Sequence, residues 1–302
     1  MRNLSFLILI VFFFSVVLLL INGGCSSVTT SYRYYYPDWT PDGRIVCIKN
    51  KVVSTTGTGV IGGSGGSETN IYYITVMDAD GTNEQDIKTI NQVGKVMASP
   101  VNNYYAFSDG NNIKVISTSG SDVSSIDCGA EVYDFDWNPS ASKLIYNAYS
   151  AGVLNEVAII DINGQNKTII SLTGSSPTWR YGNNIIFDNP IANELFRVVA
   201  LDSSSLSENE QFSNIQGGEF NISSNNLNEV YYRSANSGGI KKFNISSPEA
   251  LPDLIINRND IWNIKLSPNG QKICGTGNGA GLSLGKEIWI INIDGTGLQQ
   301  IK

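Results

Sequence analysis

Acidic residues are the first candidates for chemistry in this chain. Glu131, Asp134 and Asp136 follow one another closely. Because side chains alternate between the two faces of a strand, some of these carboxylates must share a face. Paired carboxylates can transfer protons to a substrate or bind a cation. A solvated polar lining is the commoner role for such residues, and the sequence leaves both interpretations open.

Two other motifs resemble functional sites but lack the surrounding residues that such sites need. One is a glycine-flanked serine, Gly62-Gly63-Ser64-Gly65-Gly66, which a hydrolase would need on a strand–elbow–helix unit with a histidine partner. The other is a run of oxygen-bearing side chains that resembles a calcium loop, Asp78, Asp80, Asn83 and Asp86. Equivalent positions elsewhere in the chain are plain hairpin turns. We expect a mobile loop in the first case and no metal site in the second.

The composition narrows the classes of activity further. The chain has 302 residues, no histidine and a net charge of −7. Without histidine it has neither a Ser-His-Asp triad nor an imidazole metal ligand. An acidic chain also lacks the basic patch that binding to nucleic acid requires. We therefore expect no catalytic residue, no metal and no cofactor, and predict that the protein is not an enzyme.

The N-terminus has the features of an export signal. An apolar run from Phe6 to Ile21 follows Arg2 and suits a signal peptide better than a spanning helix. The next segment, Gly23-Gly24-Cys25, resembles the lipobox of bacterial lipoproteins, although Asn22 departs from that pattern. We predict a signal or anchor over 1–24, lipid attachment at Cys25 and a tether over 25–30. An uncleaved membrane anchor is the alternative.

Cys47, Cys128 and Cys274 are the other cysteines, and their odd number leaves at least one unpaired. We expect Cys47 and Cys274 to be buried free thiols. Cys47 and Cys274 occupy equivalent places in the repeat described next, where a disulfide would need Cα atoms within about 7 Å. Four tyrosines at positions 32, 34, 35 and 36 could form a partner or glycan surface. Since half of an alternating strand faces inward, we expect most of them to be packing residues.

A repeat organises residues 31–302. Its phrase places an apolar residue two positions before a proline or its equivalent, then a turn, then an apolar strand. The proline-equivalent positions are 41, 100, 139, 181, 224 and 268, so later intervals run from 39 to 44 residues. The first interval is longer because it contains the glycine-rich stretch Ser54–Ser67, which we interpret as an inserted loop. This period is that of a four-stranded β-propeller blade.

The turn chemistry explains the phrase. Proline fixes φ, Asp or Asn bonds its own backbone, and glycine supplies positive φ. The apolar residue before the turn should end the innermost strand of each blade and pack between neighbouring blades; these residues are Trp39, Ala98, Trp137, Trp179, Ile222 and Leu266. We predict an all-β fold: a six-bladed β-propeller of four-stranded antiparallel blades, with Asp134 and Asp136 on an inner strand near the channel. The ring should close by blade packing and not by a shared strand.

Trp39-Thr40-Pro41-Asp42-Gly43 with the later Ile71–Gly81, and Leu266-Ser267-Pro268-Asn269-Gly270 with Ile288–Thr296, resemble the TolB-type propeller repeat. The resemblance implies a non-enzymatic protein–protein interaction scaffold. We therefore expect an exported, monomeric, lipid-anchored protein of the cell envelope that binds envelope proteins and no nucleic acid. The alternatives are an envelope glycan-binding or carboxylate-based enzyme propeller using Asp134 and Asp136, or a structural spacer.

Overall fold

The computed structural model describes most of the chain. The described residues are 26–58, 64–101, 103–149, 156–172, 174–179, 184–189, 194–202, 205–211, 217–222, 229–234, 239–244, 247, 251–277 and 287–302. Cys25 and the apolar run before it lie outside these residues, as do Gly62 and Gly63. Among the described residues, no helix is long and apolar enough to cross a membrane.

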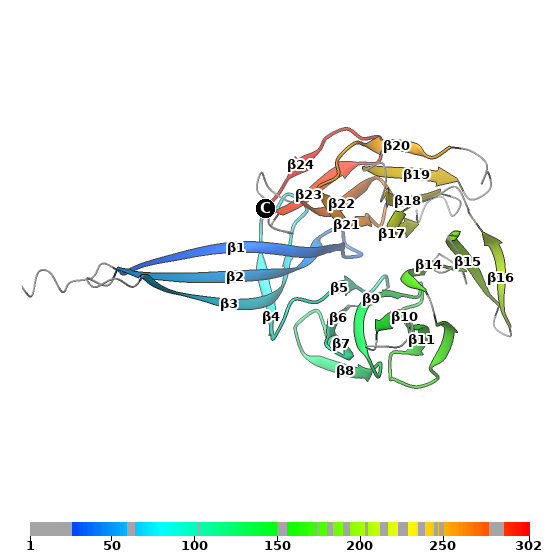
Figure 1. The fold of residues 1–302 in the computed structure, drawn as a ribbon, viewed down its shortest axis with the longest axis horizontal. Coiled ribbons are helices and arrows are strands. Elements are labelled where there is room, and N and C mark those ends of the chain that lie inside the picture. The colour runs from blue at the N-terminus through cyan, green and yellow to red at the C-terminus, as the bar shows by residue number, and fades with distance from the viewer. Residues whose placement is uncertain are drawn as a thin grey trace, which may run out of the picture. The chain divides into compact units, whose positions relative to one another are not determined.

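Strands that are consecutive in the chain form four-stranded sheets, six in the described residues (Figure 1). The first sheet contains β1 (Ser26–Trp39), β2 (Ile45–Thr58), β3 (Ser64–Met77) and β4 (Gln85–Ile90). The second contains β5 (Val96–Ala98), β6 (Tyr104–Asp109), β7 (Asn112–Ser117) and β8 (Asp122–Asp127). The third contains β9 (Glu131–Trp137), β10 (Lys143–Tyr149), β11 (Glu156–Asp161) and β12 (Thr168–Ser171).

The later sheets repeat this arrangement. The fourth contains β13 (Ser175–Trp179), β14 (Asn184–Asn189), β15 (Glu194–Asp202) and β16 (Ser205–Gln211). The fifth contains β17 (Gly217–Ile222), β18 (Glu229–Ser234), β19 (Ile240–Asn244) and β20 (Asp253–Ile256). The sixth contains β21 (Ile261–Leu266), β22 (Lys272–Gly277), β23 (Glu287–Asn292) and β24 (Gln299–Gln300). Neighbouring strands pair antiparallel, as in the four-stranded blades of a propeller.

The repeated phrase sets the end of each first strand, as the sequence predicts. The apolar residue two positions before the proline is the last residue of the first strand in all six sheets. The turn that follows is closed by backbone bonds, such as Gly43 N–H to the carbonyl of Thr40 at 2.9 Å and Gly270 N–H to that of Ser267 at 2.8 Å. Both glycines have positive φ, which is why the phrase uses this residue.

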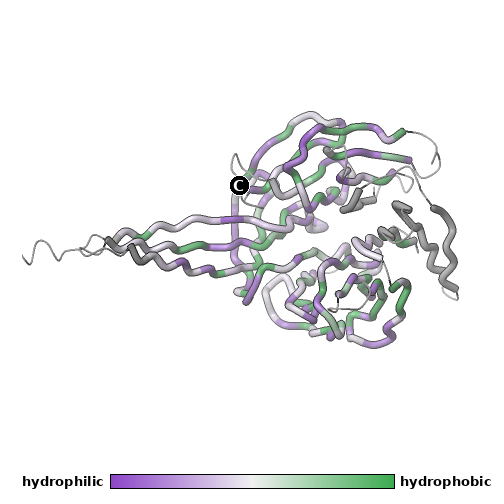
Figure 2. Tube along the Cα trace, in the orientation of Figure 1, coloured by the Kyte–Doolittle hydropathy of each residue, from purple (hydrophilic) through white to green (hydrophobic). Residues whose placement is uncertain are grey.

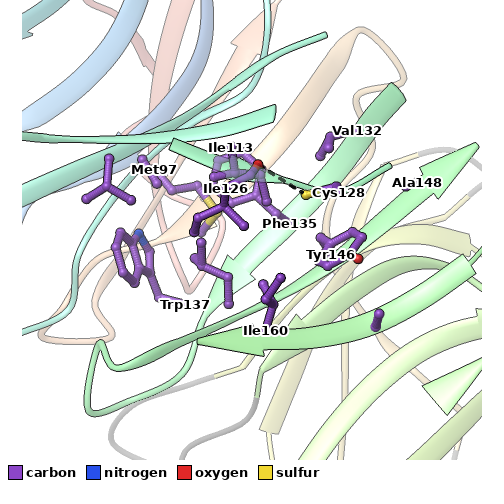
Figure 3. Close-up of a cluster of buried hydrophobic side chains, with 14 of the residues drawn as sticks. Met97, Ile113, Ile126, Cys128, Val132, Phe135, Trp137, Tyr146, Ala148 and Ile160 are labelled. Atoms are coloured by element: carbon purple, nitrogen blue, oxygen red, sulfur yellow. Dashed lines mark hydrogen bonds between the residues drawn. The ribbon is translucent and has the colours of Figure 1, made fainter. Parts of the chain in front are cut away.

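Hydrophobic side chains pack between neighbouring sheets. Figure 3 shows one such cluster, in which Met97, Ile113 and Ile126 of the second sheet meet residues of the third; these include Val132, Phe135, Trp137, Tyr146 and Ile160. Similar clusters join the first sheet to the second, the third to the fourth and the fifth to the sixth. Middle strands such as β6, β10 and β11 are buried on both faces, because their sheets pack against a neighbour on either side. Figure 2 shows hydrophobic residues within these sheets.

The first and last sheets also meet. Tyr34, Trp39 and Cys47 pack with Cys274 and Ile288 in one buried cluster. Glu84, which precedes β4, accepts a hydrogen bond from Tyr34 and pairs with Lys49 and with Lys302 at the chain end. Both lysine Nζ atoms lie 2.8 Å from a carboxylate oxygen of Glu84. These contacts join the two sheets by packing and charge and use no shared strand.

The chain divides into two compact units, and this corrects the prediction of six equivalent blades. The smaller unit consists of the described parts of Met1–Tyr32 and Lys51–Ile71; the larger comprises Arg33–Asn50 and Tyr72–Lys302. Five sheets, from the second to the sixth, lie wholly in the larger unit and are the five blades of the propeller. The first sheet is divided, because β1, β2 and β3 each have 14 residues and continue into the smaller unit.

The loop predicted over Ser54–Ser67 was wrong at both ends. Residues 54–58 belong to β2, and residues 64–67 belong to β3. Thr55 and Ser67 contact each other across the two strands, with their hydroxyl oxygens 2.6 Å apart. The threonines and valines around these positions favour strand, and the glycines did not prevent it. Residues 26–30 of the predicted tether lie in β1.

Candidate functional site: the central channel

The first strands of several sheets bring charged side chains together in the larger unit. Asp38 comes from β1, Asp134 and Asp136 from β9, and Lys265 from β21, and Lys95 immediately precedes β5. The two lysines act electrostatically on the carboxylates: Lys265 on Asp38 and Asp136, and Lys95 on Asp136. The sequence predicted the channel position of Asp134 and Asp136. Glu131 departs from that group, because its side chain is exposed.

Asp38 and Asp136 link neighbouring sheets. Asp136 accepts the backbone N–H of Trp137 at 2.8 Å with one oxygen and that of Trp179, in the next sheet, at 3.0 Å with the other. Asp38 accepts the N–H of Ala98, also in the next sheet, at 2.9 Å. Each of these aspartates directly precedes the last residue of its strand. We call this contact the inter-sheet clamp.

Burial sets the acidity of the clamp carboxyls. It raises the pKa of both Asp38 and Asp136 above the ordinary value, because desolvation disfavours the charged form. Lys265 and the backbone N–H donors act in the opposite direction and limit the rise. The pKa of Lys265 itself is raised: burial lowers it, but the carboxylates of Asp136, Asp38 and Asp134 outweigh burial.

A first cavity, which we call the polar cavity, has a volume of about 300 Å³. Asp134 and Lys95 form an ion pair in its wall, and the amide of Asn147 and the hydroxyls of β13 add to its polar lining. Burial lowers the pKa of Lys95 although Asp134 favours its charged form. Tyr133, which is 56% exposed, lies at its edge and makes an edge-to-face contact with Tyr149.

Backbone bulges shape the polar cavity. Tyr36, Ser176 and Asn263 line it, and each has a left-handed backbone, with φ of 50°, 49° and 53°. Each lies three residues before the end of its strand. The pairing register slips at this point in β13 and β21, as expected for a β-bulge. Sequence reasoning missed these residues; only Asn263 is of a type that favours positive φ.

A second cavity, the strand-end cavity, has a volume of about 340 Å³. Its wall is built by the repeated phrase: the apolar strand ends and the prolines of the turns converge there, namely Trp39, Trp137, Trp179, Leu266, Pro41, Pro100, Pro139 and Pro268. Met97 and the clamp residues Asp38 and Asp136 also line it. Lys265 faces both cavities. The sequence predicted the strand ends but not that they would enclose a cavity.

The calcium-like run is a hairpin turn held by its own side chains. Asp80 accepts the N–H and hydroxyl of Thr82, at 2.9 and 2.6 Å, and Asp78 accepts the amide of Asn83 at 2.6 Å. Asp86 pairs with Lys49 instead. The same turn recurs in the third sheet, where Asn166 donates to Asp161, and in the sixth, where Thr296 donates to Asp294. Within the described ranges, no cluster of His, Cys, Asp or Glu could hold a metal ion.

The remaining candidates are the cysteines, the four tyrosines and the glycine-flanked serine. Cys47 and Cys274 are buried free thiols, as predicted, and Cys128 is a third. Among the tyrosines, Tyr34 is buried, Tyr35 and Tyr36 pack against a core cluster, and Tyr32 is 49% exposed. The packing interpretation of that group is therefore confirmed for three of its members. Ser64 begins β3, whereas Gly62 and Gly63 of its motif lie outside the described residues, as does Cys25.

Comparisons with known proteins identify the fold. No family model matches the sequence, and no curated protein matches it. Among solved structures, the chain is similar to TolB from Acinetobacter baumannii, with a TM-score of 0.56, 11% identity, and coverage of 89% of this chain and 78% of that one. This chain has the β-propeller fold. At such low identity, the likeness concerns the fold alone.

Two further propeller neighbours come from protein complexes. A chain of a mitotic checkpoint complex has a TM-score of 0.53 and 13% identity, covering 88% of this chain and 75% of that one. A chain of a nidogen/laminin complex has a TM-score of 0.53 and 9% identity, covering 88% of this chain and 90% of that one.

Proposed function

We propose that this propeller is an exported, lipid-anchored scaffold that binds proteins of the cell envelope and has no enzymatic activity. The observation that carries the proposal is the exposed aromatic pair beside the polar cavity. Tyr133 and Tyr149 are 56% and 43% exposed, and their ring centroids lie 6.1 Å apart. Rigid aromatic side chains with a polar tip are enriched in the energetic centres of protein interfaces.

The arrangement of the channel carboxylates supports a non-enzymatic role. Asp136 uses both oxygens to accept backbone N–H groups, and Asp134 is paired with Lys95. Neither carboxylate is held ready to exchange a proton with a substrate, which acid–base catalysis would require. Propeller neighbours that occur in protein complexes favour a binding role, as does the likeness to TolB.

A six-bladed ring is part of the proposal. The portion of the first sheet within the larger unit packs against the second sheet on one side and the last sheet on the other. It would thereby serve as the sixth blade, although its first three strands continue beyond it. Glu84 and Lys302 would lock that closure.

Proximity labelling from the full-length chain tests the docking surface. We expect specific envelope proteins to be labelled by the wild type and to lose at least tenfold of their enrichment in a Tyr133→Ala/Tyr149→Ala variant. Leu254→Ala is the control, because Leu254 is similarly exposed, at 55%, on β20 of another sheet. Equal labelling by all three proteins would show that the tyrosine pair is not the docking surface. The absence of any specific envelope protein would contradict the scaffold function.

Labelling with palmitate tests the anchor separately. The wild type should incorporate the label, and Cys25→Ala should not. A label retained by Cys25→Ala would contradict attachment at this cysteine, and an unlabelled wild type would favour the uncleaved anchor.

A further inference from the structure

Asn147 offers an acceptor to the polar cavity. It is only 4% exposed, and it forms part of the cavity wall. Its amide nitrogen donates to the carbonyl of Glu156 at 3.2 Å and to that of Gly174 at 2.9 Å, so both amide hydrogens are used within the protein. These two bonds fix the orientation of the amide. Its Oδ1 atom accepts no hydrogen bond from the described residues and is not one of their fully buried unpartnered atoms, so this oxygen remains for a ligand.

Asp134 adds a second acceptor beside the first. Its Oδ1 atom accepts from both the ammonium of Lys95 and the backbone N–H of Phe135. Its other oxygen, Oδ2, has no donor in the described part of the chain, and the side chain is 25% exposed. Asp134 on β9 pairs directly with Asn147 on β10, so the two side chains lie on the same face of the sheet. The carboxylate oxygen and the amide oxygen therefore form a pair of neighbouring acceptors in the cavity wall.

Ser175 and Ser176 of β13 contribute hydroxyl groups. Both residues line the cavity and are partly exposed, and neither hydroxyl bonds to another group in the described ranges. The left-handed backbone of Ser176 marks a bulge, which explains why two consecutive residues reach the same cavity. A hydroxyl can both donate and accept a hydrogen bond. The wall thus presents two acceptors from one sheet and two hydroxyls from the next.

The charges of this wall are already balanced. Lys95 is paired with Asp134, and Lys265, which also lines the cavity, interacts with the carboxylates of Asp136 and Asp38. An anion would compete with Asp134 for Lys95, and a cation would compete with Lys95 for Asp134. An uncharged ligand disturbs this balance least.

Tyr133 adds an aromatic ring at the edge of the cavity. It is 56% exposed, and its ring meets that of Tyr149 edge to face, with the ring planes at 73°. In an edge-to-face pair each ring covers at most one face of the other. At least one face of the Tyr133 ring is therefore left uncovered by Tyr149. The face of an aromatic ring is negative and attracts the partly positive C–H groups of a ligand.

We propose that the polar cavity binds a single neutral sugar ring, a hexose or an N-acetylhexosamine. Adjacent sugar hydroxyls donate to Oδ2 of Asp134 and Oδ1 of Asn147. Further hydroxyls bond to Ser175 and Ser176, and a C–H face of the sugar lies on the ring of Tyr133. A volume of about 300 Å³ is at the lower end of the range for small-molecule sites, roughly 300 to 1,000 Å³, and so suits one ring better than a longer glycan. This site goes beyond the scaffold function, because its acceptors and hydroxyls do not belong to the tyrosine pair.

Saturation-transfer NMR on the full chain tests the site, with glucose, galactose, mannose and N-acetylglucosamine as probes. Dodecylphosphocholine micelles keep the chain in solution with a head group that contains no sugar. We expect saturable binding of at least one probe. Glucuronate should bind at least tenfold more weakly than the best neutral probe, because its carboxylate meets that of Asp134. No saturable binding of any probe, or equal binding of glucuronate, would overturn the proposal.

Replacing the carboxylate acceptor locates the binding. Asp134→Asn puts an NH₂ group in place of Oδ2 and should weaken binding of the best probe at least tenfold. Asp109→Asn is the matched control, because Asp109 also pairs with a lysine, Lys114, and its side chain is 20% exposed. Its affinity for the sugar should equal that of the wild type. Unchanged affinity in Asp134→Asn, or an equal loss in Asp109→Asn, would overturn the proposal.

The amide and the hydroxyls provide a second set of variants. Asn147→Leu removes the fixed oxygen and should abolish binding. If this variant does not fold, Ser175→Ala/Ser176→Ala takes its place and should weaken binding at least threefold. Wild-type affinity in the folded variant would overturn the role of these residues.

Proximity labelling separates this site from the scaffold function. Asp134→Asn leaves Tyr133 and Tyr149 in place, so the labelling of envelope proteins should persist while sugar binding is lost. Sugar binding by a wild type that labels no envelope protein would contradict the scaffold function alone. If the wild type binds no sugar and Asp134→Asn loses the labelling, a protein segment occupies the cavity, and the sugar site is overturned.

Discussion

The polar cavity and the strand-end cavity lie along the same inner strands, yet they hold their carboxylates in different ways. In the polar cavity, Asp134 is held by the side-chain ammonium of Lys95 and by the backbone N–H of Phe135 on its own strand. In the strand-end cavity, Asp136 is held by two backbone N–H groups on two sheets. The two residues are separated by a single position on β9. A carboxylate one place before the strand end therefore joins sheets, whereas one three places before it contributes to a cavity wall.

This difference shows which positions of the repeat can vary without disturbing the contacts between sheets. The clamp position is tied to the backbone of the next sheet, so a change there affects assembly. The bulge position lies two residues upstream of the clamp position and three before the strand end, and it carries a different side chain in each strand for which it is described, such as Tyr36, Ser176 and Asn263. Variation is tolerated there because a bulged residue takes no part in the regular pairing.

Replacing each carboxylate by its amide should separate the two roles most strongly. Asp136→Asn presents an NH₂ group to a backbone N–H, so we expect the free energy of unfolding at pH 7 to fall by about 2–3 kcal/mol. Asp134→Asn keeps the oxygen that accepts from both Phe135 N–H and Lys95, and should cost about 1 kcal/mol or less. Urea unfolding of the two variants measures both values. Equal losses would contradict the distinction between clamp and wall.

The pH dependence of stability should have opposite signs for the two kinds of carboxylate. Glu84 is held by lysines, as Asp134 is; burial raises its pKa, but Lys302 and Lys49 together lower it below the ordinary value. Its stabilisation is present above the unfolded pKa and is lost as pH falls through the folded pKa. Glu84→Gln should thus cost about 1–2 kcal/mol at pH 7 and less at acidic pH.

Asp136 should behave in reverse, since its pKa is raised in the folded protein. The stabilisation that comes from its protonated form is complete below the unfolded pKa and is lost as pH rises through the folded pKa. The difference between wild type and Asp136→Asn should therefore shrink as pH rises, while the difference for Glu84→Gln shrinks as pH falls. Urea titrations between acidic and neutral pH give both trends, with Glu131→Gln, on an exposed residue, as the flat control. Trends of the same sign would contradict the assignment.

The bulges of the polar cavity allow a smaller test. Ser176 has a φ of 49°, a region in which glycine is not strained, so Ser176→Gly should raise the free energy of unfolding by about 0.5–1 kcal/mol. Ser175 is the matched control, because it is adjacent and does not have a positive φ; Ser175→Gly should lower stability by a similar amount. Thermal or urea unfolding measures both. A loss of stability in both variants would show that Ser176 is not held in a left-handed conformation.

The sequence predicted the strands far better than the cavities, and the reason is physical. Turn chemistry is local, so proline, glycine and the apolar strand ends were enough to place the end of every first strand at residues such as Trp39 and Leu266. Asp134 and Asp136 could be assigned to the channel because alternation along one strand is also local. The clamp joins residues about 40 positions apart or more, such as Asp38 and Ala98, and no local pattern reveals it.

The stretch Ser54–Ser67 and the bulges could not be predicted from the local sequence, because both depend on pairing with a neighbouring strand. Glycines around Ser54–Ser67 indicated a loop, but β2 and β3 pair with each other and continue through most of that stretch. That pairing also divides the first sheet between two units, which an even repeat length cannot show. The bulges at Tyr36 and Ser176 depend on the backbone of the neighbouring strand, not on their own residue types.

The smallest effect is expected for the reactivity of the buried thiols. Their reactivity compares the contact between the first and last sheets with the contact between the second and third. Cys47 and Cys274 lie in the cluster between the first and last sheets, whereas Cys128 lies between the second and third. Burial raises the pKa of Cys128 to about 12 and raises those of Cys47 and Cys274 as well, so none should form thiolate at neutral pH. In a Cys25→Ser background, we expect no reaction with Ellman's reagent in the folded state and three reactive thiols in concentrated guanidinium chloride. Reaction at Cys47 and Cys274 but not at Cys128, under native conditions, would mean that the first and last sheets separate while the other contacts stay closed.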